Sequence, residues 1–274
     1  MRGNFLISQR RKVFFVKHDT LIKRQNQNLF PINREIINPN SAPLRENNSM
    51  LKIGHRGAKG YVPENTLASF QKALEMNVDG IELDVHLSVD GEIIVIHDGT
   101  VNRTTNRDGV VNQLTLKQLK SLWIEGEHKI PTLSEVFDLI DKKTFINVEL
   151  KGEHTATPVL NLIENYIKNK NWNYYHFLVS SFDWNALQEI HKLNAKIPLG
   201  ILALTDIDLA IGFAEFIQAK SIHPYFHLLT KENTLAIQQK GFEVFPWTVN
   251  ETQDIQKIKT YKVNGIITDF PDRI

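Results

Sequence analysis

The sequence contains no cysteine among its 274 residues. This absence excludes a disulfide-stapled scaffold, a thiol nucleophile and a thiolate metal site. A chain of this length needs no such staples, because it can bury a large apolar core in one α/β domain or in two smaller domains. The absence of cysteine does not indicate a cellular compartment, since a cysteine-free chain is stable in oxidising and in reducing surroundings.

Long apolar runs and an excess of one charge are also missing. No window approaches the roughly 20 uninterrupted apolar residues of a membrane-spanning helix, so the sequence excludes an integral membrane protein. Lys and Arg total 32 against 31 Asp and Glu, a net charge of +1. Nucleic acid is therefore not an expected partner, because proteins that bind it typically have a clear basic excess.

The near-zero total hides a basic N-terminal segment. Residues 1–49 contain nine Lys and Arg against three Asp and Glu, are rich in Asn, and lack a sustained helix or strand period. The apolar runs at 5–7 and 13–16 are shorter than the h-region of a signal peptide, and no small-residue cleavage site follows. We predict a disordered basic extension at 1–49 before a folded domain at 50–274, and a cytoplasmic protein. A start of translation at Met50 stays open, as does a membrane-surface or anionic partner for the extension.

From residue 50 onward, apolar runs of strand length alternate with stretches of helical period, which is typical of a parallel sheet covered by helices. Nine strands are predicted, at residues 51–55, 80–85, 93–97, 145–151, 177–182, 198–203, 221–225, 242–249 and 265–268. Helices are predicted at residues 67–74, 116–122, 133–140, 159–167, 187–193, 209–217, 235–239 and 255–258. Asn65 is the expected N-cap of the first helix, and Thr132 or Ser134 that of the third.

One of the nine strands is not part of the parallel series. Asp90-Gly91, between Val89 and Glu92, is a strong signal for a two-residue hairpin turn, so the run at 93–97 should fold back antiparallel onto the preceding strand. Eight parallel strands remain, the number that closes a (β/α)₈ TIM barrel. An open doubly wound sheet is the alternative, but the loop at 55–60 lacks the glycine pattern of a dinucleotide-binding turn.

Three carboxylates lie near the carboxyl ends of predicted strands, where the active site of a barrel is found. Glu82 and Asp84 are two residues apart on one strand, so their side chains share a face, which we expect to be the barrel interior. Glu149 has the same placement on a later strand. Neighbouring carboxylates repel unless a proton or a cation lies between them, and oxygen ligands without thiolates favour Mg²⁺ or Ca²⁺. We predict that these residues bind one divalent cation; a solvated strand face is the alternative.

Two histidines are predicted to reach the same mouth. If Val89 pairs with Glu92, the hairpin register places Asp84 opposite His97, although a bulge would shift it. His55 arrives from the end of the first strand. Two imidazoles beside a divalent cation suit general acid and general base catalysis near neutral pH. The alternative for each is a structural histidine at a strand end.

Positive charge at the same strand ends points to an anionic substrate. Arg56 offers a planar fork to phosphate oxygens and Lys151 a point charge, and with a hard cation they describe a site for a phosphate ester. Pairing of either side chain with Glu64 or Glu149 is the alternative. Phe182 and Trp247 are candidates for the wall of the substrate site, with core packing as the alternative.

In order, the motifs of residues 52–272 resemble those of the glycerophosphodiester phosphodiesterase family. They are Gly54-His55-Arg56-Gly57, Pro63-Glu64-Asn65-Thr66, Ile81-Glu82-Leu83-Asp84-Val85, Asp90-Gly91, His97-Asp98, Val101-Asn102-Arg103-Thr104-Thr105, Ile130-Pro131-Thr132-Leu133, Asn147-Val148-Glu149-Leu150-Lys151, Ser180-Ser181-Phe182, Trp247-Thr248-Val249-Asn250 and Thr268-Asp269-Phe270-Pro271-Asp272. Each motif alone is weak, but the ordered set is highly specific. The resemblance implies a barrel with a small insertion at about 98–114, like that of the compact cytosolic bacterial members.

The resemblance also implies roles for individual residues. His55 and His97 would be the acid–base pair, with His55 as the base. Glu82, Asp84 and Glu149 would bind Ca²⁺ or Mg²⁺, while Arg56 and Lys151 would hold the phosphate. The implied reaction cleaves a glycerophosphodiester to sn-glycerol 3-phosphate and an alcohol such as choline, through attack of a glycerol hydroxyl and hydrolysis of the resulting cyclic phosphate.

Three other functions stay open from the sequence. A lysophospholipase D-type phosphodiesterase would use the same chemistry with an apolar rim for an acyl chain. A Schiff-base aldolase would use Lys151, which ends a strand, but has no need for two histidines and three carboxylates. A non-catalytic binding module would not be expected to keep His55, His97 and Glu82 together.

Overall fold

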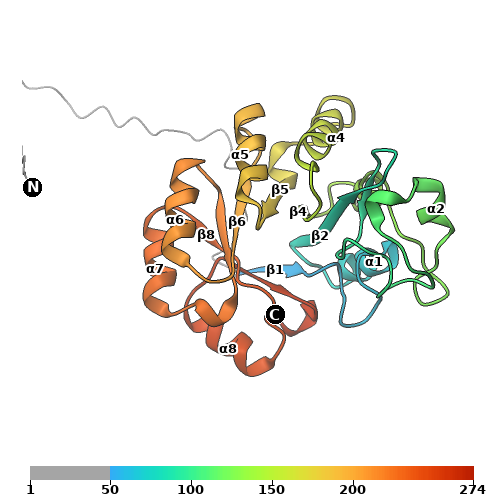
Figure 1. The fold of residues 1–274 in the computed structure, drawn as a ribbon. Coiled ribbons are helices and arrows are strands. Elements are labelled where there is room, and N and C mark those ends of the chain that lie inside the picture. The colour runs from blue at the N-terminus through green and yellow to red at the C-terminus, as the bar shows by residue number, and fades with distance from the viewer. Residues whose placement is uncertain (1–49) are drawn as a thin grey trace, which may run out of the picture. The chain divides into compact units, whose positions relative to one another are not determined.

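The computed structural model describes residues 50–274, so the extension predicted at 1–49 lies outside the described residues. Eight parallel strands follow the order β8-β7-β6-β5-β4-β2-β1-β9 (Figure 1). Backbone hydrogen bonds from Asn264 N to Val244 O and from Ile267 N to Pro246 O join the two ends of this order. The predicted TIM barrel is confirmed.

All nine predicted strands are present. They are β1 Leu51–Gly54, β2 Gly80–Leu87, β3 Ile93–Val95, β4 Phe145–Leu150, β5 Phe177–Ser181, β6 Leu199–Ala203, β7 Ser221–Pro224, β8 Glu243–Val244 and β9 Gly265–Thr268. Most bounds differ by one or two residues from those predicted. The exception is β8, which is much shorter than the run at 242–249, because Pro246 has no N–H to donate toward β9.

Helices between the strands form the outer layer of the barrel (Figure 1). They are α1 Leu67–Glu75, α2 Leu116–Ser121, α3 Leu133–Ile140, α4 Ala156–Asn169, α5 Trp184–Leu193, α6 Ile207–Phe216, α7 Lys231–Gln239 and α8 Thr252–Thr260; α2 belongs to the insertion described below. None of these helices combines the length and the apolar character that a membrane crossing requires.

The alternation of residues along the strands divides the apolar residues into two sets. On β2 the outward side chains are fully buried in the main core, which the strands form with the helices: Ile81, Leu83 and Val85. The barrel interior has its own small apolar cluster of Ile53, Leu178, Phe245 and Ile267. Glu82 and Asp84 alternate with the outward set, so they point into the barrel, and both are buried.

The hairpin after β2 is confirmed, but its predicted register is wrong by one residue. β2 and β3 pair Val85 with Val95 and Leu87 with Ile93, and Ile96 N donates to Asp84 O, so Asp84 lies opposite Ile96 rather than His97. The loop has three residues instead of two, because Ser88 and Glu92 close it and Gly91 takes a positive φ of 83°. This is the three-residue hairpin with a left-handed glycine.

The insertion after the hairpin is longer than the predicted 98–114. It contains a 3₁₀ turn at Val111–Gln113 and helix α2, and it has a separate apolar cluster: Ile94, Ile96, Val101, Val111, Leu119, Leu122, Ile124 and Ile130. Helix α2 therefore packs within the insertion, which reaches residue 130. The barrel helix that connects β2 to β4 is α3.

Helix caps were predicted correctly in one case and wrongly in another. Thr132, one of the two predicted N-caps, caps α3 in a capping box with Glu135. Helix α1 is capped by Thr66, whose side chain accepts from Ser69 N, and not by Asn65. Asn65 instead takes a positive φ of 57° and donates from Nδ2 to Asp84 Oδ2, so it supports a predicted metal ligand.

His223, inside the barrel, should make the folded protein sensitive to acid. Its ring is fully buried beside the Ser221 hydroxyl, and burial lowers the pKa of His223 to about 3. The unfolded chain takes up this proton near pH 6.5, so stability is complete above that pH and falls as the pH drops toward 3. Between pH 7.5 and 5 we expect this group to cost about 2 kcal/mol of unfolding free energy.

Urea unfolding at several pH values checks this expectation against His223→Gln, which does not titrate and keeps a polar group toward Ser221. The pH dependence of the variant should be shallower by that amount. Parallel curves for the two proteins would contradict the prediction.

Candidate active site

Three buried carboxylates meet at the carboxyl ends of β2 and β4. The strand register pairs Asp84 with Glu149, and Glu82 is two residues earlier on the same face. One oxygen of each of Glu82, Asp84 and Glu149 lies within 4.8 Å of the others. The predicted ligand set is thus brought together, in a geometry that a single cation can span.

Unpaired oxygens support a cation at this position. Glu82 Oε1, Asp84 Oδ1 and Glu149 Oε1 are buried and accept no hydrogen bond within residues 50–274. Burial and the charges of Asp84 and Glu149 raise the pKa of Glu82 well above its ordinary value, and burial beside Asp84 raises the pKa of Glu149 to about 7. Buried carboxylate oxygens without a hydrogen-bond donor are costly, and a hard divalent cation would satisfy these three. The residues therefore fit the predicted metal.

The second oxygen of two of these carboxylates is held in place by the loop after β1. Glu82 Oε2 accepts from Arg56 N at 2.9 Å, and Asp84 Oδ2 accepts from Asn65 Nδ2 at the same distance. Lys151 Nζ lies 3.0 Å from Glu149 Oε1, an ion-pair contact outside hydrogen-bond geometry. Glu82 and Asp84 are therefore oriented through one oxygen and keep the other for a ligand, whereas in Glu149 the oxygen without a hydrogen bond is the one that Lys151 contacts.

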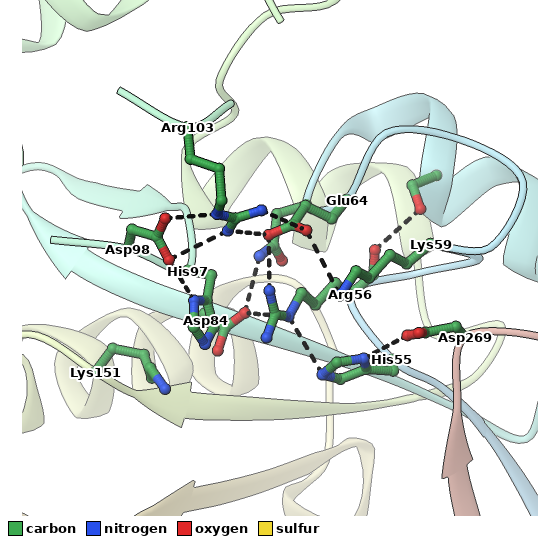
Figure 2. Close-up of polar contacts among 12 residues, drawn as sticks. His55, Arg56, Lys59, Glu64, Asp84, His97, Asp98, Arg103, Lys151 and Asp269 are labelled. Carbon is green, nitrogen blue, oxygen red and sulfur yellow. Dashed lines mark hydrogen bonds and ion pairs between the residues drawn. The ribbon is translucent and has the colours of Figure 1, made fainter. Parts of the chain in front are cut away.

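His55 stands at the end of β1 between a carboxylate and a guanidinium. Its Nδ1 lies 2.6 Å from Asp269 Oδ1, and Arg56 Nε donates to its Nε2 at 3.2 Å (Figure 2). A guanidinium only donates, so Nε2 must hold the lone pair and Nδ1 the proton. Burial lowers the pKa of His55, against the opposing effect of the Asp269 hydrogen bond. The ring is therefore a neutral imidazole with Nε2 as the acceptor.

His97 reaches the same mouth from the loop that follows β3. Its Nδ1 lies 2.6 Å from Asp98 Oδ1, and its carbonyl oxygen lies 3.1 Å from Nε2 of His86. Burial lowers the pKa of His97, while the charge of Asp84 acts in the opposite direction. The structure thus brings the predicted pair of histidines to one site, although not through the predicted strand register.

The two predicted phosphate-binding residues also lie at this mouth, and both make the ion pairs of the alternative interpretation. Arg56 Nη1 donates to Glu64 Oε1 at 2.7 Å, and Lys151 pairs with Glu149. Arg56 Nη2 makes no hydrogen bond within residues 50–274, so part of its fork is available to a ligand. These ion pairs therefore orient both cationic side chains and leave some of their N–H donors free for a ligand.

Phe182 and Trp247 form a wall beside these charges. Their rings meet edge to face with centroids 5.4 Å apart, and Tyr225 lies 5.6 Å from Trp247. Lys151 Nζ is 5.7 Å from the centroid of Phe182, which links the wall to the charged residues. Phe182 is 41% exposed, so it is not a core residue.

Four charged residues of the site were not assigned a role from the sequence. Asp269 and Asp98 hold the two histidines, and Glu64 and Arg103 connect the loops that carry them (Figure 2). Asp98 adjoins His97, which could have indicated its role. Asp269 follows the last strand, 214 residues from His55, and only its place at a strand end was a signal.

The barrel and its mouth resemble known proteins along nearly the whole described chain. A model of the glycerophosphoryl diester phosphodiesterase family matches residues 55–273. A glycerophosphodiester phosphodiesterase of Caldanaerobacter subterraneus subsp. tengcongensis is 38% identical over 235 residues, which cover 82% of this chain and 96% of that protein.

Solved structures agree with this match. A glycerophosphodiester phosphodiesterase from Thermotoga maritima is 30% identical with a TM-score of 0.69, and the alignment covers 82% of this chain and 96% of that one. An Oleispira antarctica phosphodiesterase, solved in complex with the product sn-glycerol-3-phosphate, is 28% identical with a TM-score of 0.75, over 81% of this chain and 94% of that one.

Proposed function

Because the chain belongs to the glycerophosphodiester phosphodiesterase family, we propose that it hydrolyses glycerophosphodiesters to sn-glycerol 3-phosphate and an alcohol. The observation that carries this proposal is the group of buried carboxylates, Glu82, Asp84 and Glu149, beside two histidines and two cationic side chains. A phosphodiester needs its charge neutralised and two protons moved, and these residues supply both functions.

The three carboxylates would hold Ca²⁺ or Mg²⁺, which prefer oxygen ligands of this kind. When bound, such a cation would neutralise charge on the phosphate oxygens. Arg56 and Lys151 would bind the same phosphate from the side, Arg56 through its free Nη2 and Lys151 as a point charge. Phe182 and Trp247 would cover the carbon skeleton of the substrate and exclude water from it.

His55 is the proposed general base. Asp269 on Nδ1 keeps the lone pair on Nε2, where the glycerol hydroxyl next to the phosphate would replace Arg56 Nε and give up its proton. That oxygen forms a bond to phosphorus, the bond from phosphorus to the alcohol oxygen breaks, and His97 gives the leaving oxygen a proton. Water then opens the cyclic phosphate with the proton transfers reversed, which returns both histidines to their starting states.

A lysophospholipase D-type activity is the second candidate, favoured by one observation. Phe182 and Leu204 follow the adjacent strands β5 and β6 and are 41% and 54% exposed, and such apolar side chains could contact an acyl chain. The aldolase alternative is not supported, since the Lys151 ammonium is paired with Glu149 rather than enclosed in an apolar pocket.

Release of glycerol 3-phosphate from glycerophosphocholine tests the main proposal, and lysophosphatidylcholine tests the second candidate. The proposal expects turnover of glycerophosphocholine that a chelator abolishes. Release of choline from lysophosphatidylcholine alone would favour the second candidate, and turnover of neither would contradict both.

A chain that begins at Met50 should fold as well as the full chain. Residues 50–274 contain the complete barrel and its core. The sequence of residues 1–49 lacks the apolar spacing of a helix or strand and predicts an extension. The melting temperature should change by no more than a few degrees, because about 1 kcal/mol corresponds to roughly 2–4 °C in a domain of this size. Calorimetry of the two chains checks this, and a shortened chain that fails to fold would refute it.

A further inference from the structure

The guanidinium of Arg103, in the insertion after β3, bridges two carboxylates. Its Nε and Nη2 donate to Asp98 Oδ2 and Oδ1 at 2.7 and 3.1 Å. On the other side, its Nη1 and Nη2 donate to Glu64 Oε2 and Oε1 at 3.0 and 2.7 Å (Figure 2). Both contacts are bidentate, the geometry in which an arginine pair is strongest and most directional.

Each carboxylate on Arg103 also holds a residue of the site. Asp98 Oδ1 is 2.6 Å from His97 Nδ1, and Glu64 Oε1 accepts from Arg56 Nη1 at 2.7 Å. Arg103 therefore connects the loop that carries His97 to the loop that carries Arg56. Most exposed ion pairs contribute little to stability, but the contacts of Arg103 with Asp98 and Glu64 hold groups whose orientation matters for proton transfer.

We propose that Arg103 is a positioning residue, which fixes the Asp98 carboxylate and, through it, the ring of His97 in the orientation needed to protonate the leaving alcohol. The inference rests on the proposed function. Within residues 50–274, Asp98 has hydrogen bonds only to His97 and Arg103, so Arg103 is its one anchor other than the ring it orients. The same contact lowers the pKa of Asp98, which keeps it an acceptor for the imidazole.

The guanidinium does not serve as a phosphate-binding group in this arrangement. Three of its nitrogens already donate to the two carboxylates, and the contacts with Arg103 and Arg56 lower the pKa of Glu64 to about 2 although burial opposes this. Its charge is thus neutralised within the network. A loss of activity on removal of Arg103 should appear in kcat more than in KM.

Arg103→Met tests the proposal, with Arg107→Met as the matched control. Arg107 lies in the same insertion, is exposed, and makes no side-chain ion pair within residues 50–274. Arg103→Met should lower kcat on glycerophosphocholine by about 10- to 100-fold, the effect of a misplaced catalytic group. Arg103→Lys should recover only part of it, because an ammonium cannot bind two carboxylates as a fork.

The leaving group separates positioning of His97 from a general structural effect. On the p-nitrophenyl diester of glycerol 3-phosphate, whose leaving group needs no proton, the loss in Arg103→Met should shrink, as it should in His97→Ala. In a His97→Ala background, Arg103→Met should cost less than threefold. Equal losses on both substrates, an undiminished loss in that background, or kcat equal to that of Arg107→Met would overturn the proposal.

A nuclear magnetic resonance measurement on the metal-free protein does not depend on turnover. The short contact between His97 Nδ1 and Asp98 should give a downfield imidazole proton, which Arg103→Met should broaden or shift and Arg107→Met should leave unchanged. If the wild-type protein has no diesterase activity, the proposed function fails, while this resonance still tests the positioning. A His97 proton unaffected by Arg103→Met would refute it.

Discussion

Chelation of divalent cations should abolish hydrolysis of glycerophosphocholine, and Glu82→Ala should abolish it even in excess Ca²⁺ or Mg²⁺. Glu82, Asp84 and Glu149 are buried, and each has an oxygen that accepts no hydrogen bond within residues 50–274. One oxygen of each lies within 4.8 Å of the others. A cation held there would stabilise the transition state by several kcal/mol, so we expect a loss of about 10³-fold or more.

Binding of the cation can be measured apart from activity. Mg²⁺ or Ca²⁺ should raise the melting temperature of the wild-type protein, because a ligand that binds only the folded state stabilises it. Glu82→Ala should lose this shift while its circular dichroism stays that of a barrel. Glu127→Ala is the control, since Glu127 is exposed and makes no ion pair within residues 50–274. Full turnover in excess EDTA would refute the prediction.

The grouping of the three carboxylates could be predicted from the sequence because their placement follows from strand geometry alone. Glu82 and Asp84 share a face because side chains alternate along β2. Glu149, on the neighbouring strand β4, points to the same face. Parallel strands bring their carboxyl ends to one mouth, so His55, Arg56 and Lys151 follow from the same rule. None of these inferences needs a distance between side chains.

The supporting contacts could not be predicted, because they depend on loop conformations. The hairpin signal Asp90-Gly91 suggested a two-residue turn, but the Ser88 hydroxyl binds both Asp90 and Glu92 and closes a three-residue loop, which shifts the register by one. Asn65 was expected as a helix cap, yet its positive φ aims its amide at Asp84. These loop conformations are set by local hydrogen bonds, and the spacing of apolar residues along the chain does not predict such bonds.

Loss of either proposed catalytic histidine should lower kcat by about 10²- to 10⁴-fold, the usual contribution of a general acid or base. His55 and His97 each use Nδ1 to bind a carboxylate, Asp269 and Asp98. Within residues 50–274, Nε2 of His97 makes no hydrogen bond, and Nε2 of His55 accepts only from Arg56, a contact that a substrate hydroxyl would replace. Because both act on one transition state, the double variant should be little worse than the poorer single variant. His191→Ala, on the outer helix α5, is the control and should keep full activity.

The two histidines should differ in their dependence on pH and on the leaving group. His55 accepts from Arg56 at Nε2 and is the proposed neutral base, so His55→Ala should remove the acid limb of the kcat/KM profile. Since burial lowers the pKa of His55, that limb in the wild-type enzyme should lie below pH 6.5. His97→Ala should remove the basic limb and should be partly rescued by a p-nitrophenyl leaving group, which departs without a proton. Equal losses for both variants on natural and activated substrates would mean that the two rings do not divide the proton transfers as their contacts imply.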